Sequence, residues 1–153
     1  MDIRKLTPHD FDNVVNTFGE EIILFNILTF EENSCTLGAF KDKRLVGIIA
    51  AKPRQLIKPL DAYQDLFITY INVLKEHRNQ GIATELIRTV ENFAKQQGFF
   101  QITAWSNENT IEMNHLALKL KYSMCQAFMY DENYLPKRPD DHIKGYYYGK
   151  RLD

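Results

Sequence analysis

Residues 71–98, INVLKEHRNQGIATELIRTVENFAKQQG, restrict the fold of this chain more than any other stretch. The segment starts inside an apolar run typical of a buried strand, passes through a polar loop with one glycine, Gly81, and ends in a long amphipathic pattern. The apolar side chains of that pattern recur at the spacing of one helical face, at Ile82, Leu86, Val90 and Phe93. Gly98 then stands where a left-handed residue can end a helix. We therefore predict a strand, a glycine loop and a long helix in direct succession.

The patterns before this segment predict a capped helix and an antiparallel hairpin. Thr7, Pro8 and Asp10 supply an N-cap, a proline at the first helical position and an acid in the first turn. The helix that follows should bury apolar side chains at Phe11, Val14, Val15 and Phe18. We interpret the evenly apolar residues 20–30 as a second short helix. Residues 35–53 predict two antiparallel strands around the polar turn 41–43, and we expect Pro53 to end the second strand.

The patterns after the long helix predict a return to the sheet. Residues 66–74 and 99–105 are interpreted as strands on either side of the helix, and such a succession forms a right-handed crossover between parallel strands. A further helix over residues 110–121 and two closing strands, at 125–130 and 144–152, complete the chain. The expected fold class is therefore α+β, with a single domain over residues 1–153 built around a mixed central sheet.

Composition and charge exclude several classes of protein. With 153 residues, 44% of them hydrophobic and 25% charged, the chain has the composition of one globular domain. The net charge of -1 gives no reason to expect a nucleic-acid partner. No apolar run reaches the roughly 18 residues of a membrane span, and residues 1–12 are polar, so we expect a cytoplasmic protein without a membrane partner. The cysteines and histidines are scattered, and we expect neither a disulfide framework nor a metal.

The loop between the strand and the long helix has the features of a phosphate site. Where a chain leaves a central strand and enters a helix, free N–H groups and the positive end of the helix dipole face one point. Gly81 permits close approach of a diphosphate, small Ala83 keeps the next turn open, and Arg78 adds a cation. The competing interpretation is a turn that only needs a flexible residue. Walker and dinucleotide loops do not fit, because Gly81 is followed by Ile82 instead of lysine and no further spaced glycines are present.

Residues 73–87, VLKEHRNQGIATELI, resemble the acyl-CoA loop of the GNAT acetyltransferase superfamily. That loop has Arg or Gln, two residues, Gly, one residue, and then Gly or Ala, which Arg78, Gly81 and Ala83 match, with Val73 at the usual strand end. Three further stretches are similar to the family's opening strand and helix, second hairpin, and central helix with fifth strand: MDIRKLTPHDFDNVV, KDKRLVGIIAAKP and ENFAKQQGFFQITAW. The resemblance implies a mixed sheet of about six to seven strands, splayed at strands four and five and flanked by about four helices.

The resemblance also implies acetyl-CoA as co-substrate and assigns its binding site. Main-chain N–H groups would wrap the CoA diphosphate, at Arg78, Asn79, Gln80, Gly81, Ile82, Ala83 and Thr84. The pantetheine arm would enter at the end of strand four, often at a bulge near Ile71 and Asn72. The backbone N–H of Val73 would donate to the thioester oxygen. Asn107 or Asn109 would lie near the pantetheine.

The implied reaction is direct transfer, in which a neutral amine attacks the thioester carbonyl and a thiolate leaves. A base must take the amine proton, and an acid can protonate the sulfur. Many family members carry a glutamate four residues before the strand-end valine, but this chain has Thr69 there. Carboxylates in segments that border the acceptor are the candidate bases: Glu20, Glu21, Glu76 and Asp65.

The usual acid of the family is absent as well. The helix after strand five is expected to end at Lys121 and Tyr122, which puts Ala117 in the position of the family's tyrosine. His115 and Tyr122 are the nearest titratable substitutes. Tyr134 lies in a stretch with weak similarity to the loop that borders the acceptor in members that acetylate peptide N-termini.

We therefore expect an N-acetyltransferase that moves an acetyl group from acetyl-CoA to a primary amine in a ternary complex. The acceptor is either a small molecule or a peptide N-terminus. The alternative is a non-catalytic acyl-CoA-binding sensor or assembly module, which the missing glutamate and tyrosine leave open. Nucleic acid and membrane are not expected as partners, and a homodimer is left open.

Overall fold

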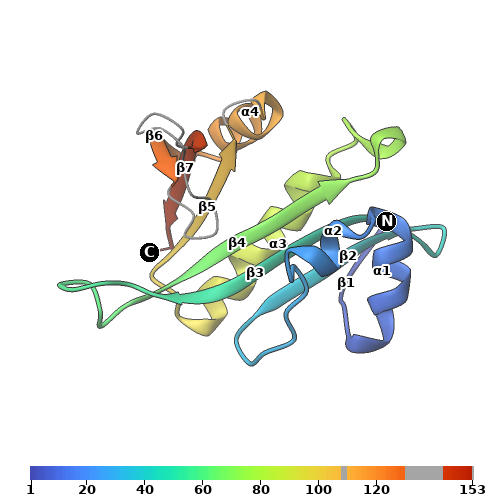
Figure 1. Cartoon of the computed structure of the whole chain (residues 1–153), viewed down its shortest axis with the longest axis horizontal. Helices are drawn as coiled ribbons and strands as arrows, with labels where there is room; N and C mark the ends of the chain where they lie inside the picture. The colour runs from blue at the N-terminus through green and yellow to red at the C-terminus, as the bar shows by residue number, and fades with distance from the viewer. Residues whose placement is uncertain (108–109, 130–142, 153) are drawn as a thin grey trace. The chain divides into compact units, whose positions relative to one another are not determined.

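The computed structural model describes residues 1–107, 110–129 and 143–152. Its strands are β1 (Asp2–Lys5), β2 (Cys35–Lys41), β3 (Arg44–Gln55), β4 (Gln64–Val73), β5 (Gln101–Asn107), β6 (Ser123–Met129) and β7 (Ile143–Arg151). Its α-helices are α1 (Phe11–Phe18), α2 (Glu21–Leu24), α3 (Ile82–Gln97) and α4 (Ile111–Lys119), and 3-10 turns occupy Pro8–Asp10 and Lys75–His77 (Figure 1). These seven strands and four α-helices of the described residues confirm the predicted α+β class.

The contacts between residues divide the chain into two compact units. The first unit consists of Met1–Ile102 together with the chain end, Arg151–Asp153, and the second consists of Thr103–Lys150. The single domain over residues 1–153 stays a prediction. None of the described helices combines the length and the apolar character that crossing a membrane requires.

Antiparallel strands in the order β1-β2-β3-β4 form the sheet of the first unit. A two-residue turn joins β2 to β3, because Lys41 pairs with Arg44 and leaves only Asp42 and Lys43 between them. Both turn residues have positive φ, 50° and 65°. Positive φ at both central positions is typical of the type I′ turn, whose twist suits a hairpin. The predicted hairpin and its turn are confirmed.

Pro53 does not end β3, which was the prediction. The strand continues to Gln55, and Pro53 pairs with Leu66 of β4. The pairing of β3 with β2 stops at Ala51, so beyond this point β3 has a partner on one side only. Proline is tolerated in such a ribbon because its missing N–H can face the open edge.

After α3 the chain returns to the same sheet. The Phe100 N–H donates to the Gln64 carbonyl at 3.0 Å, so β5 begins beside the beginning of β4. This is the arrangement expected for two strands that run in the same direction after a helical crossover. The Leu152 N–H donates to the Phe100 carbonyl at 3.3 Å, which fixes the end of the chain at the same place.

Helices cover both faces of the sheet in the first unit (Figure 1). On one face, Val14 of α1 and Ile22 of α2 are buried in a cluster with Ile48 and Ala50 of β3. On the other face α3 packs closely against Gly47, where a Cβ would lie 3.0 Å from Ile82 Cγ2. The predicted apolar face of the long helix is confirmed by the burial of Ile82, Leu86 and Val90. This packing holds the loop before α3 at the end of β4.

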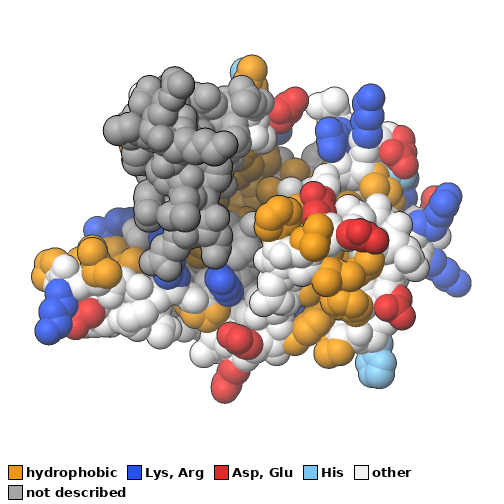
Figure 2. Space-filling view, viewed as in Figure 1, with side chains coloured by type: hydrophobic (Ala, Val, Ile, Leu, Met, Phe, Trp, Pro, Cys, Tyr) orange, Lys and Arg blue, Asp and Glu red, His pale blue; other side chains and the backbone are white. Residues whose placement is uncertain are grey.

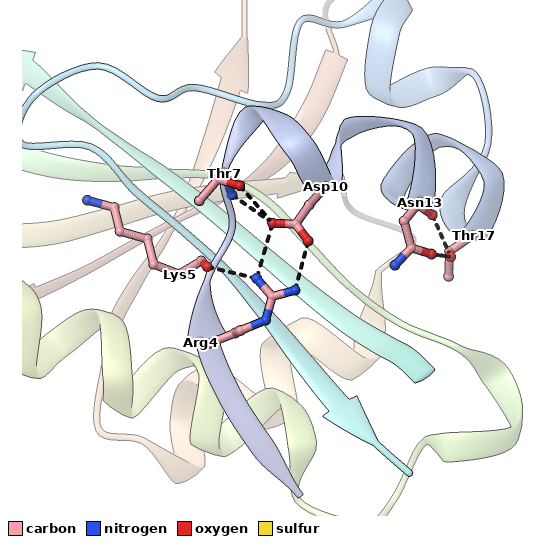
Figure 3. A network of polar contacts seen from close by, with 6 residues as sticks. All are labelled: Arg4, Lys5, Thr7, Asp10, Asn13 and Thr17. Atoms are coloured by element: carbon pink, nitrogen blue, oxygen red, sulfur yellow. Dashed lines mark hydrogen bonds and ion pairs between the residues drawn. The ribbon is translucent and has the colours of Figure 1, made fainter. Parts of the chain in front are cut away.

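A charged network fixes the entry into α1 (Figure 3). Arg4 donates to both carboxylate oxygens of Asp10, at 2.8 and 3.1 Å, and the Thr7 N–H donates to Oδ2 at 2.9 Å. The hydrogen bond from Arg4 is the main reason why the pKa of Asp10 is lowered to about 2. The predicted cap is confirmed, and its first turn, Pro8–Asp10, is a 3-10 turn that leads into α1.

In the second unit a buried tyrosine connects three elements. Tyr148 of β7 is 1% exposed, its hydroxyl lies 2.5 Å from Ser106 Oγ of β5, and it donates to Asn114 Oδ1 of α4. β6 pairs with β7 as an antiparallel strand. Tyr148 therefore belongs to the packing of this unit.

Helices α3 and α4 end in the same way. The residue at each end has left-handed φ, 77° at Gly98 and 63° at Lys121. The next residue donates back into the last turn, Phe99 to the Ala94 carbonyl and Tyr122 to the Ala117 carbonyl. These bonds are those of the Schellman motif. Both predicted helix ends, at Gly98 and at Lys121 with Tyr122, are confirmed.

Candidate active site

β4 contains a bulge in the middle of the strand. Its register against β3 shifts between Ala50 and Ala51, which leaves Thr69 without a partner. The Thr69 hydroxyl donates to the Ala50 carbonyl at 3.1 Å, so this carbonyl has a hydrogen-bond donor at the point where the register shifts. The bulge that we expected near Ile71 and Asn72 therefore lies earlier in the strand, and those two residues pair regularly with β3.

The end of β4 presents the backbone of Val73 to the edge away from β3. The Leu74 N–H donates to the Val46 carbonyl at 2.9 Å, so the adjacent pair of Val73 and Gly47 is a non-hydrogen-bonded one. The Val73 N–H and carbonyl consequently point away from β3. The carbonyl accepts a hydrogen bond from Arg78 Nε at 2.8 Å. Arg78 thus ties the loop to the strand end through one nitrogen, and its other guanidinium N–H groups extend from an exposed side chain.

The loop from Arg78 to α3 is an exposed, left-handed turn. Asn79 has φ of 58° and Gly81 has φ of 82°, and the side chain of Gln80 accepts from Lys41 Nζ at 3.3 Å. A Cβ on Gly81 would meet no atom within 4 Å, so no packing within the described residues requires glycine there. The backbone angle requires it instead, and the empty space lies at the start of α3, whose first N–H groups have no acceptor within the helix.

A hydrogen-bonded chain of three side chains lies under α2, on the face of β4 opposite α3. Asn72 Nδ2 donates to the Tyr70 hydroxyl at 2.9 Å, and Tyr70 donates to Glu21 Oε1 at 2.5 Å. All three side chains are half-buried. Burial, and then the bond to Glu21, raise the pKa of Tyr70 to about 12, so this phenol is a donor at neutral pH. One candidate base, Glu21, is thereby brought to the strand that ends at Val73.

The other three candidate bases do not take part in this hydrogen-bonded chain. Glu20 and Glu76 are exposed, and Asp65 is fully buried at the start of β4, where it forms an ion pair with Arg54 at 2.7 Å. Nowhere in the described parts of the chain do three or more His, Cys, Asp or Glu side chains gather in a group that could hold a metal ion.

The candidate acids belong to the second unit. His115 of α4 is exposed, and Tyr122 is 7% exposed with its ring 5.4 Å from Lys150 Nζ. Ala117, which we expected in the position of the family's tyrosine, is buried. Asn107 ends β5. Asn109 and Tyr134 lie outside the described residues.

Sequence reasoning missed Tyr70 as a site residue. Tyr70 and Asn72 lie two positions apart on one strand, so they share a face, and this spacing was the only signal available. Glu21 is 49 residues away from Tyr70 along the chain, and only the packing of α2 on the sheet brings them together.

Comparison with known proteins gives the family. The model of the Acetyltransferase (GNAT) family matches residues 2–120. Among solved structures, Arabidopsis thaliana NAA60 in complex with acetyl-CoA superposes with a TM-score of 0.76 over 98% of both chains, at 14% sequence identity. At this identity the superposition shows a shared fold.

Two curated relatives are more similar in sequence. Probable N-acetyltransferase camello of Xenopus laevis is 36% identical over 74 residues, which cover 48% of this chain and 32% of that protein. N-acetyltransferase 8 of Homo sapiens is 34% identical over 88 residues, which cover 58% of this chain and 37% of that protein. The matched part spans about a third of the length of these relatives.

Proposed function

The chain belongs to the GNAT acetyltransferase family, and on this basis we propose that it transfers the acetyl group of acetyl-CoA to a primary amine. The acceptor is a small-molecule amine or a peptide amino terminus, and it attacks while both substrates are bound. The observation that carries the proposal is the loop between β4 and α3, in which the exposed, left-handed Gly81 stands directly before the helix.

The loop supplies the groups that a diphosphate needs. The N–H groups of Ile82, Ala83 and Thr84 form the first turn of α3, where they lack intrahelical acceptors and add to the positive end of the helix dipole. Asn79, Gln80 and Gly81 precede this turn and are exposed, and we assign their backbone N–H groups to the same diphosphate. Arg78 adds a cation. Its Nε donates to the Val73 carbonyl, and its two terminal nitrogens can donate to a phosphate.

The reaction takes place at the end of β4. The amine nitrogen bonds to the thioester carbonyl carbon, negative charge develops on the carbonyl oxygen, and the carbon–sulfur bond then breaks to release a thiolate. A backbone N–H donor at that oxygen stabilises the charge. We assign this role to Val73, whose N–H points away from β3.

The test is release of free thiol from acetyl-CoA in the presence of ethylamine, phenethylamine, spermidine and tetraalanine, each in a separate assay. We expect thiol release with at least one amine, and mass spectrometry should find one acetylated amine for each thiol released. Saturable binding of acetyl-CoA without thiol release would contradict the proposal and favour a non-catalytic binder. A cytoplasmic location stays a prediction.

A further inference from the structure

We propose that Glu21 takes the proton of the acceptor's ammonium group, with Tyr70 and Asn72 as positioning residues. This inference rests on the proposed function, because it names the group that completes the same reaction. The proposed base therefore lies on helix α2, because strand β4 of this chain contains no glutamate that could serve as the base.

The direction of the hydrogen bonds leaves one carboxylate oxygen for a ligand. The Asn72 amide donates to the phenol oxygen, and the single phenol proton is donated to Glu21 Oε1. Within the described parts of the chain, Glu21 Oε2 has no hydrogen-bond partner. A carboxylate can accept several hydrogen bonds, so Oε2 remains able to accept one from an ammonium group. The phenol fixes the carboxylate without neutralising it.

The position of this network suits the acceptor side of the reaction. It runs from α2 to Asn72, the residue immediately before Val73, and it lies on the face of the sheet opposite α3. The amine can therefore approach from the α2 face while the loop before α3 holds the CoA. All three side chains are half-buried, so solvent and a ligand can reach them.

The surface beside Glu21 is apolar. Ile23, Leu24 and Phe25 continue the α2 segment and are 53%, 75% and 75% exposed. Hydrophobic side chains gather over the region of α1 and α2 in Figure 2. A carboxylate beside exposed apolar side chains is complementary to an amine that carries an apolar group. We therefore expect phenethylamine to be a better acceptor than ethylamine.

The proton balance of the step is simple. A primary amine with a pKa near that of lysine, about 10.4, is an ammonium at neutral pH and must lose one proton before its nitrogen can attack and a second after the bond forms. Glu21 Oε2 holds the ammonium and takes its first proton, which passes from the half-buried carboxyl group to water. The neutral nitrogen then attacks with its free electron pair. The nitrogen of the adduct is much more acidic and gives its second proton to the regenerated Glu21 carboxylate, while the thiolate leaves with the electrons of the carbon–sulfur bond.

The test uses the Glu21→Gln variant, in which the amide oxygen still accepts from Tyr70 but the charge is gone. We expect kcat/KM for phenethylamine and for tetraalanine to fall about 100-fold or more, while acetyl-CoA affinity stays unchanged. Formate should restore part of the activity of Glu21→Ala and none of that of Glu21→Gln, since only the alanine variant leaves room for a small carboxylate. Glu32→Gln, at an exposed position outside this network, should stay within about twofold of wild type.

Tyr70→Phe separates positioning from catalysis. It removes the bond that orients Glu21 and keeps the carboxylate, so we expect a loss of about 10-fold, mainly in KM for the amine. Wild-type transfer rates in Glu21→Gln, or a Glu21→Ala variant that formate does not restore, would overturn the role of Glu21. A wild-type protein that binds acetyl-CoA and acetylates none of the four amines would instead contradict the proposed function, and this inference would fall with it.

Discussion

At the scale of single residues, Gly81 shows how backbone geometry and ligand space act together. Its φ of 82° disfavours any β-branched residue, and a Cβ at this position would meet no atom of the described residues within 4 Å apart from its chain neighbours. Gly81→Val should therefore weaken acetyl-CoA binding about 10-fold or more, because strain in the turn and the added methyl groups both displace the N–H contacts. Titration calorimetry with acetyl-CoA measures the change.

Gly81→Asn is the matched control, since asparagine tolerates left-handed backbone better than valine does. Weakened binding in a stably folded asparagine variant would assign the effect to the occupied space. Arg78→Ala should cost less than Gly81→Val, because an exposed charge is screened by solvent. Normal affinity in a folded Gly81→Val protein would refute the assignment of the loop.

The Asp10 carboxylate gives a prediction about stability and pH. Its pKa of about 2 lies below the value near 4 of an unfolded chain, so its bonds stabilise the fold above pH 4 and are lost as the pH falls through 2. Arg4 is 45% exposed, which reduces the gain to about 1 kcal/mol. Asp10→Asn should lower the free energy of unfolding by this amount at pH 7, and the difference should be much smaller at pH 2, where about half of the Asp10 carboxyl groups are protonated. Urea titrations at the two pH values test this, with the exposed Asp12→Asn as control.

The sequence predicted the residues of the loop before α3, but it did not identify the hydrogen-bonded residues under α2. The residues of the loop are consecutive, so their types and spacing could be interpreted before any packing was known. Glu21 was one of four candidate carboxylates, and nothing in the sequence distinguished it from the other three. Tyr70, which selects it, is an ordinary strand residue in the sequence, and its contact with Glu21 depends on how α2 lies on β4.

At the scale of elements, the two left-handed helix ends predict opposite effects of substitution. Lys121 adopts φ of 63° with an exposed side chain, a conformation that costs about 1 kcal/mol for any residue with a Cβ. Lys121→Gly should raise the free energy of unfolding by about 0.5 to 1 kcal/mol, whereas Gly98→Ala at the end of α3 should lower it by about 1 kcal/mol. Denaturant unfolding with unchanged m-values measures both. A destabilised Lys121→Gly would show that the lysine side chain contributes more than its backbone costs.

Elements were predicted best where one local pattern decides the outcome. The turn at Asp42 and Lys43, the cap at Thr7 and the apolar face of α3 depend on neighbouring residues, and all three are confirmed. Pro53 was misjudged because its effect depends on which strands flank it. The bulge at Thr69 was misplaced for the same reason, since a register shift is a property of two strands.

At the scale of the whole molecule, the fold tolerates wide divergence in sequence. NAA60 shares 14% of aligned residues with this chain and superposes over 98% of it. What the two chains need to share is the order of elements and the burial of apolar faces, because cores accept many combinations of similar volume. Catalysis depends on particular side chains, whereas packing depends mainly on volume. We therefore expect the residues at Thr69 and Ala117, where the family resemblance predicts a glutamate and a tyrosine, to affect the mechanism more than the fold.

The missing phenol leads to a prediction about turnover. A thiol with a pKa near 8.5 leaves as thiolate without much assistance, so an acid should contribute little to the rate. His115 is exposed, and Tyr122 is buried with its ring centroid 5.4 Å from Lys150 Nζ. We expect His115→Ala and Tyr122→Phe each to lower kcat by less than about 10-fold, with KM for acetyl-CoA little changed. In wild type, kcat should rise with pH as the amine loses its proton and should show no falling alkaline limb. Profiles of kcat against pH for the three proteins decide the matter: a loss of about 1000-fold in a folded variant that still binds acetyl-CoA would identify that residue as the acid.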